Sequence, residues 1–127
     1  MRILAALALI LAAASASAAP STFSVPYGTT WQINYTNVPC PSGVTCNVAI
    51  ARAPATAAGN CAAASFTQLT GTAPIAGPYV DSTALLGYFC YFAVNVWTIS
   101  GQTMTSGPSP YLFVTIAPTA PSSIAGK

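Results

Sequence analysis

The sequence contains no histidine and no glutamate, and Asp81 is its only acidic residue. Its basic residues are Arg2, Arg52 and Lys127, so charged side chains make up 3% of the 127 positions, whereas an average soluble domain has about 25%. Paired catalytic carboxylates, a Ser-His-Asp triad, a Cys-His dyad and metal sites of His, Asp and Glu ligands all lack their parts. We expect a protein that is not an enzyme and that holds no cofactor and no metal.

The amino terminus has the pattern of an export signal. Met1 and Arg2 precede an unbroken apolar run over residues 3–14, and the small residues at 16–18 fit a cleavage site, with a second candidate cut two residues earlier. The run is shorter than the roughly 20 residues of a membrane-spanning helix, and no later segment is long enough. We predict a signal peptide over residues 1–18 and a chain that is secreted, periplasmic or on the cell surface, with no membrane span.

The net charge of the chain without the predicted signal peptide limits the choice of partners. Arg52 and Lys127 oppose Asp81, so the side chains of the mature chain carry a net charge of +1. That is too little positive charge to bind nucleic acid or an anionic membrane. The partner we expect is a protein or a cell-surface polysaccharide.

Short segments of alternating polarity, separated by turn residues, predict strands. In residues 29–36, Trp31, Ile33 and Tyr35 fall on one face and polar residues on the other. Strands are predicted over residues 22–25, 29–36, 45–52, 65–70, 78–83, 87–97 and 111–116. About seven strands with turn signals every 8–12 residues are typical of an antiparallel sandwich of two sheets. The sequence therefore predicts an all-β fold.

Three stretches carry a family resemblance. They are an aromatic-x-Asp segment at residues 79–83, a glycine followed by an aromatic-rich strand at residues 87–95, and a Pro-Ser pair within residues 106–109. Together they resemble the latter half of a fibronectin type III-like domain of a secreted bacterial or phage-associated protein. Phe89 stands where a tyrosine of this class makes a corner hydrogen bond, so we expect that bond to be missing.

The resemblance implies a fold and a division of the chain. The fold is a seven-stranded antiparallel immunoglobulin-like sandwich over residues 19–117, between the signal peptide and a Pro/Ser-rich tail at residues 118–127. By analogy alone it also implies a spacer or binding module.

The four cysteines behind an export signal indicate two disulfides, for which three pairings are possible. We favour Cys40–Cys46, which encloses a Pro-Ser-Gly turn, and Cys61–Cys90, which would tie the loop at residues 53–64 to the strand that contains Cys90. The spacing of the cysteines has no Cys-x-x-Cys pair, which argues against a zinc site.

The strand predicted over residues 87–97 also indicates a candidate interaction face. If Phe89, Tyr91 and Ala93 face the core, the neighbouring side chains of that strand must point the other way. These outward side chains are Phe92, Val94 and Val96. Large apolar patches usually mark interfaces, so we expect this face to be covered by the loop at residues 53–64 or by another chain. We favour the loop, because the Cys61–Cys90 bridge would hold it there.

These observations favour a non-catalytic extracellular module that acts as a spacer, adhesion or assembly domain. A carbohydrate-binding module is an alternative, and it requires Trp97, Tyr88 or Tyr111 to be exposed and coplanar. A structural domain of a phage virion or surface layer is another. For Asp81 we expect bonds to nearby backbone amides at a turn, and for Arg52 a place on the surface.

Overall fold

The computed structural model describes residues 20–36, 39–70 and 78–127. The predicted signal peptide lies outside these ranges. The described strands are β1 (Ser21–Pro26), β2 (Thr45–Ala55), β3 (Thr67–Gln68), β4 (Gly87–Ile99), β5 (Gln102–Thr105) and β6 (Leu112–Ala117), with one short 3-10 turn, η2, at Cys61–Ala63. No α-helix occurs in this part of the chain, so the fold is all-β as predicted.

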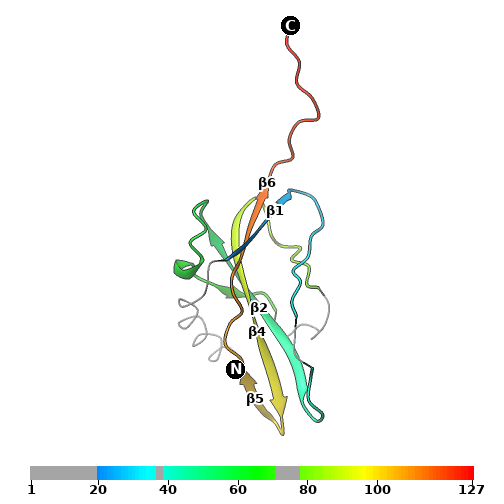
Figure 1. The fold of residues 1–127 in the computed structure, drawn as a ribbon, viewed down its shortest axis with the longest axis vertical. Helices are drawn as coiled ribbons and strands as arrows, with labels where there is room; N and C mark the ends of the chain where they lie inside the picture. The colour runs from blue at the N-terminus through cyan, green and yellow to red at the C-terminus, as the bar shows by residue number, and fades with distance from the viewer. Residues whose placement is uncertain (1–19, 37–38, 71–77) are drawn as a thin grey trace.

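The strands form one sheet of six strands in the order β1-β6-β4-β2-β3, and β5 pairs with the far end of β4. Figure 1 shows β2 and β4 running along the length of the sheet, with the segment after β6 leading away from it. All strand pairs are antiparallel except β1 and β6, which run parallel. The sheet therefore differs from the predicted seven antiparallel strands in strand number and in the direction of β1.

The predicted strand at residues 29–36 is reduced to a single bridge. Ile33 and Tyr79 exchange two backbone hydrogen bonds of 2.7 and 2.9 Å, and no longer ladder forms around them in the described residues. A strand needs a neighbour along its edge, and the segment beside it turns away at Asp81, whose side chain accepts the backbone N–H of Thr83. The alternating pattern thus set which side chains face inward without producing a strand.

The sheet buries apolar side chains on both faces. We call the side under the Ile33–Tyr79 bridge the bridge face; its buried residues are Val25, Ile33, Val48, Ile50, Tyr91, Val114 and Ile116. We call the opposite side the loop face; its buried residues are Ala49, Ala51, Cys61, Cys90, Phe92, Val94, Val96 and Tyr111. Because β4 is apolar on both sides, it lies in the middle of the sheet between β2 and β6.

Candidate functional site

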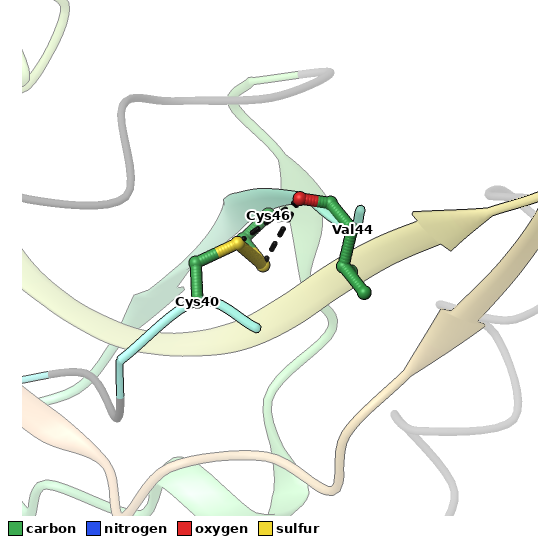
Figure 2. The surroundings of a disulfide bond; sticks show 3 residues. All are labelled: Cys40, Val44 and Cys46. Atoms are coloured by element: carbon green, nitrogen blue, oxygen red, sulfur yellow. Dashed lines mark hydrogen bonds between the residues drawn. A yellow bond between two sulfur atoms is a disulfide. The ribbon is translucent and has the colours of Figure 1, made fainter. Parts of the chain in front are cut away.

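The structure contains the two disulfides that the sequence favoured. Cys61 in η2 is bonded to Cys90 in β4, with the Cα atoms 5.6 Å apart and both residues buried. Cys40 is bonded to Cys46 at the start of β2, with the Cα atoms 6.0 Å apart. Figure 2 shows the carbonyl oxygen of Val44 facing both sulfurs of this bond, 3.1 Å from the Sγ atom of Cys40. Disulfides form and persist in oxidising compartments. The two disulfides therefore indicate that the chain folds in such a compartment.

The predicted interaction face is buried within the chain. Phe92, Val94 and Val96 belong to the loop face and are 2–3% exposed. The ring of Phe66, which follows η2, lies 4.8 Å from the ring of Phe92, centroid to centroid, and stacks on Tyr111 at 5.6 Å. The side chains that cover this face belong to the same chain: Cys61 of the loop at residues 53–64 is in the same buried cluster, and Phe66, just after the loop, packs against it.

Asp81 lies at the centre of a hydrogen-bond network. Its side chain is 1% exposed and forms an ion pair of 2.7 Å with Nη1 of Arg52, whose side chain is 22% exposed. The hydroxyl of Tyr91 donates to the same carboxylate oxygen at 2.8 Å. The other oxygen accepts from the backbone N–H and the hydroxyl of Thr83, at 3.0 and 2.6 Å. The turn role predicted for Asp81 is present, and the bonds from Arg52 and Tyr91 are additional to it.

The network changes the acidity of its members. Burial raises the pKa of Asp81, but the hydrogen bonds from Thr83, Tyr91 and Arg52 outweigh it and hold the pKa below its usual value. Burial and the adjacent carboxylate raise the pKa of the Tyr91 hydroxyl well above its usual value. Arg52 also lies over the ring of Phe89, with Cζ 5.3 Å from the ring centroid. At neutral pH the site therefore holds a carboxylate, a guanidinium and a neutral phenol.

Tyr91 makes a hydrogen bond that the sequence analysis did not predict. Phe89 cannot make the corner hydrogen bond, and we expected that bond to be missing. Tyr91, two residues later on β4 and on the same side of the strand, instead bonds Asp81. A tyrosine hydroxyl of this strand thus ties β4 to the segment before it.

A second feature is a group of exposed apolar side chains at one end of the sheet. They are Tyr27, Val80, Leu85 and Leu86, which are 47–64% exposed, and we call them the end patch. All but Leu86 line a cavity of about 290 Å³, which is also bordered by Trp31 and Ile116.

The fold brings the end patch together from three segments. Tyr27 follows β1, and its backbone N–H donates to the carbonyl of Ala117 at the end of β6, at 2.7 Å. The chain then reverses at Gly28, whose φ of +86° favours glycine. Val80 and Leu85 lie on either side of the turn that Asp81 organises, and Asp81 itself borders the cavity. The buried network therefore positions the segment at residues 80–86, which carries three of the four patch residues.

The end patch was not predicted from the sequence. The signal that could have identified it is the pair Leu85-Leu86, which stands outside every predicted strand, between the Asp81 turn and Gly87. Large apolar residues in a short loop must pack against another element or stay exposed.

The three aromatic residues that were candidates for carbohydrate binding do not form an exposed, coplanar platform. Tyr111 is 4% exposed. Tyr88 and Trp97 are an odd number of residues apart on β4, so they point to opposite faces of the sheet. Tyr88 instead stacks on Phe113, with the ring planes 1° apart.

Within the described ranges, no group of three or more His, Cys, Asp or Glu side chains could hold a metal ion. In the same residues no helix has the length and apolar character to cross a membrane. Comparisons of the chain with protein-family models, with curated proteins and with solved structures found no match.

Proposed function

We propose that this chain is a non-catalytic extracellular module of the immunoglobulin-like sandwich class, and that it acts in adhesion or assembly by binding a protein partner through the end patch. Assembly here includes packing among the subunits of a virion or surface layer. The observation that carries the proposal is the end patch itself, whose four large apolar side chains are 47–64% exposed, with three of them lining a cavity. Contiguous apolar surface of this kind is uncommon on monomers and usually marks an interface.

The strand arrangement supports the proposed class. In an immunoglobulin-like sandwich, strands C, F and G share one sheet and strands B and E pair in the other. In this assignment β2, β4 and β6 correspond to strands C, F and G. They share one sheet, and β4 lies between β2 and β6. The Ile33–Tyr79 bridge joins the segments that correspond to strands B and E.

The bonding of the carboxylate and of the cysteines supports a non-catalytic role. The single side-chain carboxylate is buried and accepts hydrogen bonds from Arg52, Tyr91 and Thr83. The four cysteines are all in disulfides. A nucleophile in this chain would therefore have no side chain available as a general base. The disulfides and the predicted signal peptide support an extracellular or periplasmic location.

Site-specific photocrosslinking tests the proposal. A photoreactive amino acid is placed at Leu85 in the protein exported by its own cells, and the matched control carries it at Met104, which is 54% exposed on β5. We expect a discrete crosslinked protein from Leu85, absent from Met104 and lost when Leu86→Ser is added. Equal crosslinking from both positions, or none from Leu85, would overturn the proposal.

A further inference from the structure

β1 is an edge strand of the described sheet. The backbone N–H groups of Ser21 and Tyr27 donate to the carbonyls of Tyr111 and Ala117, so the odd-numbered residues of β1 bond to β6. The N–H and C=O groups of Thr22 and Ser24 therefore point away from the sheet. No other strand in the described residues pairs with this side, and both residues are exposed.

This edge is protected only at its ends, by Pro20 and Pro26. Natural edge strands are blunted by charged side chains, bulges, prolines or a covering segment. β1 has the sequence Ser-Thr-Phe-Ser-Val-Pro, with no charged residue, and its proline is the last residue of the strand. Pro26 leaves the outward N–H groups of Thr22 and Ser24 in place.

We propose that a second copy of this chain binds at this edge, with the two β1 strands antiparallel about a twofold axis at Phe23. Thr22 of each copy then lies opposite Ser24 of the other, and the two pairs exchange four main-chain hydrogen bonds. The contact is self-complementary, because the same two residues supply every donor and acceptor. It joins the two sheets into one.

Three features of the edge favour a second copy as the occupant. The outward groups are symmetric about Phe23, as a twofold contact requires. The strand carries no charge that would repel its own copy. The ring of Phe23 is 41% exposed, and on the axis it would pack against its counterpart.

The pairing also continues into the end patch. The ring of Phe23 lies 5.9 Å from that of Trp31, centroid to centroid, and Trp31 borders the cavity of the patch. A copy bound at β1 therefore also approaches the patch. This part of the inference rests on the proposed function, because it takes the partner of the end patch to be a second copy of the chain.

Cysteine crosslinking tests the register. In the proposed pairing, the Cα atoms of the two Phe23 residues are about 4.5 Å apart, which a disulfide can span. The two Ser24 residues are offset by about 7 Å along the strand alone, which is too far. We expect Phe23→Cys to form a disulfide-linked dimer on mild oxidation and the control Ser24→Cys to stay monomeric on a non-reducing gel, with peptide mapping to show that the two native disulfides are intact.

A second pair of variants tests the main-chain bonds. Ser24→Pro removes an outward N–H from each copy, whereas Ser24→Ala keeps it. We expect the dimer dissociation constant from sedimentation equilibrium to rise about 30-fold for the proline variant, because two hydrogen bonds are lost, and to stay unchanged for the alanine variant. An unsubstituted protein that stays monomeric at all concentrations, or equal crosslinking of the two cysteine variants, would overturn the proposal.

The failure of this inference is distinguishable from failure of the proposed function. If Leu85 crosslinks to a different protein while Phe23→Cys stays monomeric, the end patch binds a partner and β1 does not pair with a copy. If Phe23→Cys forms the dimer and Leu85 gives no crosslink, the edge pairing holds and the patch is not the binding surface.

Discussion

Replacing Asp81 with alanine removes the carboxylate on which four donors converge. The hydroxyl of Tyr91 and the two donors of Thr83 lose their acceptor, and Arg52 loses its counterion. Breaking a buried ion pair by removing one partner destabilises a protein by about 3–5 kcal/mol. Water reaches the side chain of Arg52, which is 22% exposed, so we expect the lower end of this range, a loss of about 3 kcal/mol in the free energy of unfolding.

Urea unfolding followed by tryptophan fluorescence measures this loss, with Arg52→Met as the matched partner variant. The double variant completes a mutant cycle, and directly bonded residues should show a coupling energy of about 1–3 kcal/mol. A loss below about 1 kcal/mol for Asp81→Ala, or a coupling energy near zero, would refute the reasoning.

The same network predicts how stability depends on pH. The pKa of Asp81 is lower in the folded protein than its unfolded value of about 3.9. Its contribution is therefore complete above about pH 4 and is lost as the pH falls through the folded value. The pKa of Tyr91 is raised, so its contribution is complete below about pH 10 and is lost as the pH rises further.

Since the chain has no histidine and no glutamate, we expect a flat stability between about pH 5 and pH 9. The decline in acid should not exceed about 1.4 kcal/mol per pH unit, the limit for one proton. Unfolding curves across this range check the shape. The decline should be nearly absent in Asp81→Ala, and an unchanged decline in that variant would contradict the assignment to this carboxyl.

Three other outcomes are expected from the same fold. The double variant Cys61→Ser and Cys90→Ser should lose about 3.6 kcal/mol in urea unfolding, because it frees a loop of about 30 residues; an unchanged midpoint would contradict the constraining role. Tyr91→Phe should lose about 1–2 kcal/mol by removing one buried hydrogen bond. Its acid decline should be smaller and should end at a higher pH, because the folded pKa of Asp81 moves toward the unfolded value; an unchanged decline would mean that the hydroxyl does not bond the carboxylate. Leu85→Ser should leave the free energy of unfolding within about 0.5 kcal/mol of the parent and reduce the fluorescence of a bound hydrophobic dye, with Met104→Ser as the control; equal reductions would show that the dye does not report the patch.

Local rules were enough to predict the all-β class and the pairing of the cysteines. Alternation placed Cys90 on the opposite side of β4 from Tyr91, and the structure has this division. The Pro-Ser-Gly turn made Cys40–Cys46 a feasible short ring, as observed. Both inferences depend only on neighbours along the chain and on the period of a strand.

The strand directions and the location of the exposed surface depended on contacts between distant segments. The parallel pairing of β1 with β6 joins residues about 90 positions apart, and no local pattern specifies its direction. Phe92 points away from Tyr91 as expected, and part of its cover is Phe66, which lies just beyond the loop at residues 53–64 that we favoured. The ion pair of Arg52 with Asp81 was missed for the same reason, since the two residues are 29 positions apart.

The pairing of Arg52 with Asp81 has a consequence for how fast this protein can find a partner. It neutralises the charge of Asp81, which borders the cavity of the end patch, so this ion pair adds little long-range field to draw a partner toward that surface. Association should then proceed at the unassisted rate of about 10⁵–10⁶ M⁻¹s⁻¹ and should be nearly independent of ionic strength. The lifetime of the complex, set by how well the apolar side chains are covered, would determine its affinity.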